Sequence, residues 1–180
     1  MKVAITGAMG VGKTTLAEQI GQMQLMRVLP EVARVMEDLG YKLDAEATPE
    51  LESKIADYQS RLENEYTEWV ADRCLVDTLA YTMALFPEEN RLQNEINDKL
   101  CDAEYDIILY IPPEFPIEND GVRSTDKEFQ QTIDRTIRMI LSTMKNVFII
   151  RGSREERLQE ALTQIIIYED IRKRNTIPSR

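Results

Sequence analysis

The sequence predicts an α/β fold in which helices cover both faces of a five-stranded parallel sheet. Apolar runs of strand length alternate with segments of helical periodicity along the 180 residues, and this alternation is typical of parallel sheets. A glycine-rich turn joins the first apolar run to the first helical segment. No internal repeat and no linker rich in Ser and Gly interrupts the pattern. We therefore expect a single domain that spans residues 1–180.

The five expected strands are the short apolar segments. The segment KVAIT comes first, and YDIILYI is apolar enough for a strand that is buried on both faces. We expect EWVADR to lie beside the first strand. In chain order the strands are residues 2–6, 26–30, 68–73, 105–111 and 146–150.

Helical periodicity fills the gaps between these strands, beginning near residues 13, 31, 49, 75, 87, 125 and 153. Thr48 and Pro49 have the character of an N-cap and a first helical position. Apolar residues then recur at spacings of three and four, which predicts one buried helix face made of Leu51, Ile55, Tyr58 and Leu62. After Pro87 a further row aligns on one face, and it forms core more often than a subunit interface: Leu92, Ile96 and Leu100. The oligomeric state stays open.

Composition excludes several kinds of chemistry. The chain has no histidine, and its two cysteines, Cys74 and Cys101, lack the spacing of metal ligands, so neither a zinc site nor histidine acid–base catalysis is expected. The cysteines are expected to be reduced packing residues. No apolar window is long enough to cross a bilayer, and we expect no membrane partner and a cytoplasmic protein. The net charge of −10 disfavours broad, non-specific DNA binding.

The segment GAMGVGKTT, residues 7–15, carries the clearest functional signal. Its spacing fits G-x-x-x-x-G-K-[ST], and it lies between a strand and a helix, as a phosphate-binding P-loop does. Such a loop turns backbone N–H groups toward phosphates, while its lysine neutralises their charge and its hydroxyl coordinates Mg²⁺. The nucleotide-binding candidates are Gly7, Gly10, Gly12, Lys13, Thr14 and Thr15, with Thr14 as a metal ligand. The sequence therefore predicts a P-loop NTPase fold that binds a nucleoside triphosphate and Mg²⁺, with the preference for ATP or GTP left open.

The rest of the chain favours a small kinase over other P-loop proteins. It has no N-K-x-D motif for reading guanine, and no strand ends in the Asp–Glu pair that ATP-hydrolysing machines use. Phosphoryl transfer requires positioning, charge neutralisation and a group that accepts the acceptor's proton. Glu31 and Asp72 follow two predicted strands, so both should face the loop across the carboxyl edge of the sheet. Arg73 adjoins Asp72, and Arg123 lies in the long loop 112–125, which contains three prolines and could close over the phosphates.

Several segments in this order resemble a family of small P-loop kinases: GAMGVGKTT, LPEVARVM, ADRCLVDTLAY and YDIILYIPPEFPIENDGVR. The family is related to the nicotinamide-riboside-kinase domain of bacterial NAD regulators and includes phage thymidylate-kinase-like proteins. The likeness runs from residue 3 to about residue 160. It implies ATP-dependent transfer of the γ-phosphate to a hydroxyl of a nucleoside or nucleotide acceptor.

The resemblance also implies roles for single residues. Glu31 resembles the base that faces the acceptor hydroxyl, and Asp72 with Arg73 resembles the acidic–Arg pair that supports the metal or acceptor and contacts phosphate. Which of the two acids is the base stays open. Arg123 resembles the lid arginine, and Arg151 lies in the loop 151–157, which resembles the loop that packs on adenine. Cys74 stands where relatives often have Ser, which puts a hydroxyl contact to the acceptor in doubt.

Two alternatives remain at this stage. Some phage relatives phosphorylate the hydroxymethyl group of 5-hydroxymethyluracil in DNA, and the basic last third, with Arg135, Arg138 and residues 172–174, would then follow the DNA phosphates. Such a phage-encoded enzyme would act in the cytoplasm of the host cell. The other alternative is a regulator that binds a nucleotide and signals by closing its lid without any transfer.

Overall fold

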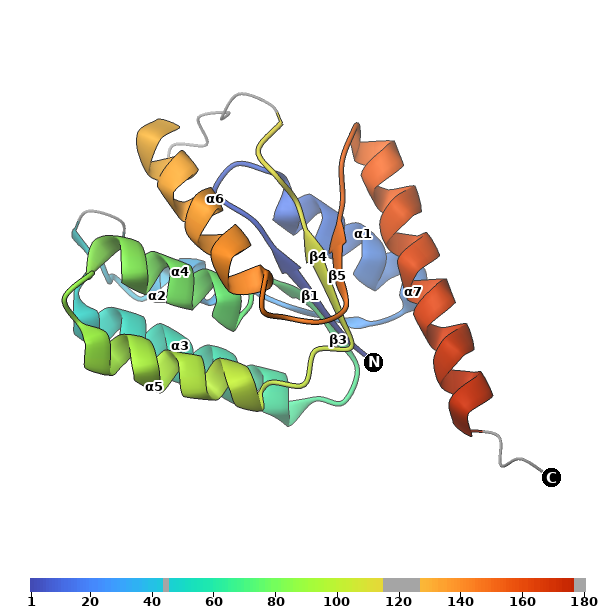
Figure 1. Ribbon diagram of the computed structural model, residues 1–180, viewed down its shortest axis with the longest axis horizontal. Helices are drawn as coiled ribbons and strands as arrows, with labels where there is room; N and C mark the ends of the chain where they lie inside the picture. Colours follow the sequence, from blue (N-terminus) through green and yellow to red (C-terminus); the bar gives the residue numbers. More distant parts are fainter. Residues whose placement is uncertain (44–45, 115–126, 177–180) are drawn as a thin grey trace.

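In the computed structural model, described for residues 1–43, 46–114 and 127–176, five strands form one parallel sheet in the order β2-β3-β1-β4-β5 (Figure 1). The strands are β1 (Lys2–Thr6), β2 (Arg27–Leu29), β3 (Trp69–Asp72), β4 (Ile107–Tyr110) and β5 (Val147–Ile149). All five were predicted, including the place of β3 beside β1, where Ile5 pairs with Asp72. Because β1 lies at the centre, the ends of β3 and β4 flank the loop that follows β1.

Seven helices are described: α1 (Lys13–Gln24), α2 (Val32–Asp38), α3 (Pro49–Glu65), α4 (Leu75–Leu85), α5 (Asn90–Asp102), α6 (Lys127–Leu141) and α7 (Arg154–Thr176). Helices α1 and α7 pack together on one face of the sheet, while α4 packs with α5 and α6 on the other (Figure 1). The predicted α/β fold, with both faces covered, is confirmed. None of the described helices is long and apolar enough to span a membrane.

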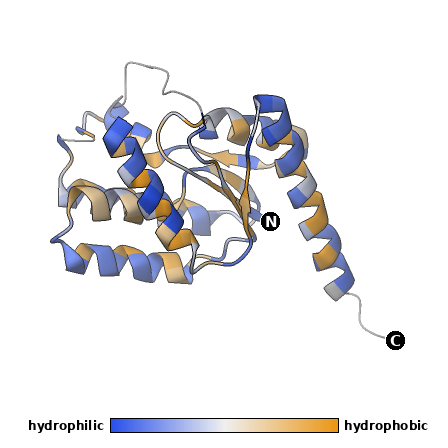
Figure 2. Cartoon of the chain, turned by 45° about the horizontal axis from the view of Figure 1, so that its top comes forward, coloured by the Kyte–Doolittle hydropathy of each residue, from blue (hydrophilic) through white to orange (hydrophobic). Residues whose placement is uncertain are grey.

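Two hydrophobic clusters lie on the two faces of the sheet. One joins sheet residues such as Ala4 and Ile108 to α4, α5 and α6, and contains the predicted row Leu92, Ile96 and Leu100. The other joins Val3 and Leu109 to α1 and α7. Figure 2 shows the strands mainly in orange, with blue and orange alternating on the surrounding helices, as expected for helices with one buried face.

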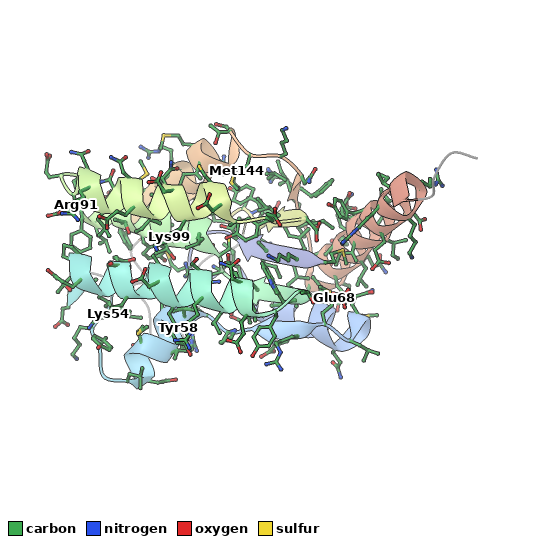
Figure 3. The ribbon with its side chains drawn as sticks, turned by 90° about the horizontal axis from the view of Figure 1, so that it is seen from below. Lys54, Tyr58, Glu68, Arg91, Lys99 and Met144 are labelled. Carbon is green, nitrogen blue, oxygen red and sulfur yellow. The ribbon has the colours of Figure 1, made fainter. Side chains whose placement is uncertain are left out.

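Three sequence expectations need correction. Tyr58 is exposed and lies on the edge of α3 away from α5 (Figure 3), because α3 turns a polar row that includes Gln59 into the protein. Helix α5 begins at Asn90 and not at Pro87, because a turn closed by a hydrogen bond from Glu89 N–H to the carbonyl of Phe86 intervenes. The segment SREERLQEAL predicts a last helix over residues 153–162, but the helix continues to residue 176 because neither Pro nor Gly interrupts it.

Candidate active site

The loop between β1 and α1 has the backbone shape of a phosphate cradle. Gly7, Gly10 and Gly12 all have positive φ angles, a region that glycine enters without steric cost. A Cβ atom at Gly7 would lie 2.4 Å from the carbonyl oxygen of Ile111. The first glycine of the motif is therefore required by both conformation and space.

Lys13 lies across this loop. Its buried side chain donates hydrogen bonds of 2.8 Å to the carbonyl oxygens of Gly7 and Ala8. The N-terminus of α1 faces the same loop, and no acidic residue occupies its first turn. The partial positive charge of the helix terminus and the ammonium group therefore both favour an anion here.

Thr14 and Asp72 join the loop to the end of β3. The Thr14 hydroxyl donates a 2.6 Å hydrogen bond to Oδ2 of Asp72. The other carboxylate oxygen, Oδ1, is buried and has no hydrogen-bond partner in the described part of the chain. A buried carboxylate oxygen beside a hydroxyl suits Mg²⁺, which takes one or two protein oxygens and completes its shell with water and phosphate. The described residues contain no cluster of three or more side chains able to hold a metal alone.

Arg73 points to the other side of the same strand end. Its φ is 74°, and its buried guanidinium lies 2.5 Å from Glu31 and 3.4 Å from both Asp77 and the Tyr81 hydroxyl. Burial acts to lower the pKa of Arg73, but Tyr81 and Asp77 raise it above its ordinary value. The side chain therefore stays charged, and its orientation is fixed by three partners.

A pocket opens beside Arg73. Its apolar walls come from α2, the segment after it and α3: Val32, Ala33, Leu43 and Ile55. Its polar side chains come from α3 and α4: Glu52, Gln59, Asp77, Thr78 and Tyr81. Apolar walls with a few fixed polar groups are typical of sites for small molecules.

Other side chains support the loop from behind, and we did not single these out from the sequence. Arg157, at the start of α7, is buried and donates a 2.6 Å hydrogen bond to the Val11 carbonyl. It also pairs with Glu114 at 3.2 Å. Gln130 on α6 donates to the Met9 carbonyl at 2.8 Å. Because Arg157 and Gln130 each lie more than 100 residues from the loop carbonyl that they contact, no local spacing could have revealed them.

The structure brings most of the predicted site residues together. Lys13, Thr14, Asp72, Arg73 and Glu31 meet at the carboxyl edge of the sheet. Thr15 is half-buried on α1, one position further on. Arg151 is exposed at the end of β5 and pairs with Glu114 at 3.1 Å. Arg123 lies outside the described residues.

Cys74 does not line the pocket. It is buried at the N-cap of α4, where its thiol donates to Asp77 at 3.7 Å. Burial, together with Asp77 and Glu63, raises the pKa of the Cys74 thiol well above its ordinary value. Cys74 therefore lies beside the pocket, and Arg73 and Asp77 are the neighbouring residues that line it.

The sequence profile of a family described as an AAA domain, AAA_28, matches residues 2–157. The chain belongs to this family. The name AAA is also used for ATP-hydrolysing machines, which use an Asp–Glu pair at the end of a strand. In this protein β4 ends at Tyr110 and is followed by Ile111 and Pro112, so this strand end carries no such pair. No curated protein matches this AAA-domain chain in sequence.

Solved structures similar to this AAA-domain chain include NadR in complex with NR, with 20% identity, a TM-score of 0.79, and coverage of 92% of this chain and 50% of that one. The chain thus spans about half the length of NadR. A deoxyadenosine kinase from M. mycoides covers 92% of this chain and 98% of its own at 13% identity and a TM-score of 0.66. The match to the YorR protein of Bacillus subtilis, bound to phosphorylated GDP, covers 94% of this chain and 98% of that one, with 13% identity and a TM-score of 0.62. These matches confirm the P-loop fold and the resemblance to NadR.

Proposed function

We propose that this protein is an ATP-dependent kinase that transfers the γ-phosphate to a hydroxyl group of a nucleoside. One observation carries the proposal: consecutive residues at the end of β3 reach a phosphate-binding loop and a separate pocket. Asp72 contacts Thr14 of the loop, whereas Arg73 lines the pocket. A kinase needs a donor site and an acceptor site that meet at one point, and a nucleotide-binding switch does not need the second site.

The residues of the loop fit the donor. Backbone N–H groups of residues 7–13 and the ammonium of Lys13 would hold the phosphates, and Thr14 with the free oxygen of Asp72 would hold Mg²⁺. A Mg²⁺ ion held by Thr14 and Asp72 would supply positive charge to offset the negative charge of the phosphates. Arg157 keeps the loop in shape through the Val11 carbonyl.

On the acceptor side, we assign the base to Glu31 and not to Asp72. Asp72 is engaged by Thr14 on the loop side, whereas Glu31 lies beside the pocket residues Val32 and Arg73. Arg73 would hold the Glu31 carboxylate in place and contribute positive charge next to the phosphoryl group in flight. A positioned carboxylate can then accept the proton of the acceptor hydroxyl.

The charge of the pocket favours a nucleoside over a nucleotide as the acceptor. Among its described lining residues, Glu52 and Asp77 are acidic, and Arg73 is the one cation. That guanidinium is already paired with both Glu31 and Asp77. A phosphate group entering the pocket would therefore lose its hydration without gaining an uncommitted cation from these walls.

The described contacts favour a small acceptor over DNA. Two of the late basic residues pair with neighbouring carboxylates, Arg138 with Asp134 and Arg172 with Asp106. Helices α6 and α7, which carry these basic residues, lie on opposite faces of the sheet (Figure 1). Their charges do not join into one surface beside the pocket.

The proposal is tested with γ-labelled ATP and Mg²⁺ against separate acceptors. These are nucleosides including nicotinamide riboside, nucleoside monophosphates, plain DNA and DNA containing 5-hydroxymethyluracil. We expect label on nucleosides and none in reactions with the Lys13→Met variant. Label confined to hydroxymethylated DNA would move the activity to DNA modification. Tight ATP binding with no label on any acceptor would instead favour the regulatory switch.

A further inference from the structure

Helix α3 buries a polar row that the proposed transfer reaction does not use. Gln59 and Glu63, one turn apart, are 2% and 3% exposed. Gln59 lines the acceptor pocket. Glu63 lines a different pocket, together with Tyr105, Lys2 and Lys99. Figure 3 shows α3 and α5 running side by side, with Lys99 labelled between them. Buried polar groups are retained where their hydrogen bonds are satisfied, so their partners are informative.

A chain of hydrogen bonds holds these side chains. The backbone N–H of Leu75 donates to the Tyr105 hydroxyl at 3.2 Å, and that hydroxyl donates to Oε2 of Glu63 at 2.8 Å. The other carboxylate oxygen, Oε1, accepts a 2.7 Å hydrogen bond from Nε2 of Gln59. The same Nε2 lies 3.5 Å from the carbonyl oxygen of Arg73.

These hydrogen bonds determine which end of the Gln59 amide is available to a ligand. An ionised carboxylate can only accept hydrogen bonds, so Glu63 requires the NH₂ end of the amide. The amide oxygen of Gln59 has no protein partner among the residues described. Because the side chain lines the pocket and its nitrogen is engaged elsewhere, the oxygen is left to the bound acceptor.

We propose that Glu63, from outside the pocket, orients Gln59 so that its amide oxygen selects acceptors whose base donates a hydrogen bond. This inference rests on the proposed kinase function and names its selectivity. Glu63 is a positioning residue, since it acts through Gln59, and Tyr105 fixes Glu63 in turn. A ligand without such a donor would leave the buried amide oxygen of Gln59 without a hydrogen bond. We expect this to weaken binding of that ligand by about 10- to 100-fold.

Protonation of Glu63 would reverse this arrangement. A protonated carboxyl group donates through its O–H, and the Gln59 amide would have to rotate to accept that bond, turning its NH₂ group toward the acceptor. Several other groups face Glu63: Lys2 from β1, Cys74 and Asp77 from the start of α4, and Lys99, Asp102 and Glu104 from α5 and its end. Burial raises the pKa of Glu63 to about 7, despite the hydrogen bonds from Gln59 and Tyr105.

The test compares ligand pairs that differ at one donor: adenosine with purine riboside, which lacks the amino group, and thymidine with 3-methylthymidine. The binding affinity is measured by calorimetry and the rate by steady-state kinetics. Both are measured at a pH above the pKa of Glu63, which is about 7. For the unaltered protein we expect the ligand with the donor to bind about 10- to 100-fold more tightly.

Two variants isolate the positioning role. Glu63→Gln introduces an amide that can offer either end to Gln59, so we expect the preference to fall to about twofold, with KM raised and kcat nearly unchanged. Gln59→Leu should lose the preference equally. The control is Glu65→Gln, on the same helix but exposed, which should retain it. Lowering the pH through about 7 should weaken the preference of the unaltered protein and of Glu65→Gln, and should leave Glu63→Gln and Gln59→Leu unaffected.

The outcomes separate this inference from the proposed function. Phosphoryl transfer without discrimination within either pair overturns the inference and leaves the kinase assignment intact. Discrimination that persists in Glu63→Gln overturns the role of Glu63. Failure of every nucleoside to bind overturns both.

Discussion

Asp72 and Arg73 are consecutive residues whose side chains contact two different parts of the candidate active site. Asp72 accepts a hydrogen bond from Thr14 at 2.6 Å, and Arg73 donates to Glu31 at 2.5 Å. The left-handed backbone of Arg73, with φ of 74°, turns the chain between them. A non-glycine residue in this conformation costs on the order of 1 kcal/mol and persists where its surroundings hold it. The strain is therefore located where the proposed donor and acceptor sites meet.

Asp72→Asn should make ATP binding insensitive to Mg²⁺. The amide oxygen can still accept from Thr14, but the negative charge that would hold the cation is lost. We expect the Kd for ATP to rise at least about 10-fold in Mg²⁺ and to change little in EDTA. Calorimetry in both buffers measures this, with Asp98→Asn on the exposed side of α5 as control. Equal Mg²⁺ dependence in the two variants would remove Asp72 from the metal site.

Arg157→Ala should weaken both the phosphate loop and the fold. It leaves the Val11 carbonyl without its buried donor and removes one partner of Glu114. We expect a loss of about 2 kcal/mol in the free energy of unfolding, and ATP binding weakened by about 10-fold. Denaturant unfolding and ATP titration provide the measurements. Arg154→Ala, three residues earlier and exposed, should change neither quantity, and equal effects in both variants would contradict a special role for Arg157.

Glu63 should make stability depend on pH near neutrality. Burial raises its pKa from 4.5 to about 7 in the folded protein, so the folded state binds this proton more tightly than the unfolded state. The resulting stability is fully present below about pH 4.5 and is lost as the pH rises to about 7. The loss is on the order of 3 kcal/mol. The free energy of unfolding, measured with urea across this pH range, should depend less on pH in Glu63→Gln than in the unaltered protein. The same pH dependence in both proteins would contradict the role of Glu63.

Much of the fold could be predicted because its signals are local. The spacing of Gly7, Gly12 and Lys13 identified the loop, and the apolar segments identified all five strands. The Thr48 cap, which accepts from the Leu51 N–H, follows from residue type alone. The place of β3 beside β1 was predicted, and the parallel direction of the strands placed Asp72 and Glu31 at one edge of the sheet.

The rest depends on tertiary contacts that the sequence does not encode locally. The prediction that Tyr58 lies on the buried face of α3 is wrong, because α3 buries the polar row of Glu52, Gln59 and Glu63 and leaves Tyr58 exposed. That row, at spacings of seven and four, was a readable signal for a polar buried face. Arg157 could not be separated from the exposed Arg154, since its burial and its contacts with Val11 and Glu114 are tertiary features.

The central claim, that Glu31 acts on the acceptor beside a separate ATP site, is tested most directly by Glu31→Gln. The amide keeps the size of the side chain and can still accept from Arg73, but it cannot take a proton. Single-turnover transfer from ATP to a nucleoside and the Kd for ATP are measured together, with Asp38→Asn at the exposed end of α2 as control. The account predicts a transfer rate reduced by about 100-fold or more, with the Kd for ATP unchanged within about twofold. An unchanged transfer rate would contradict it.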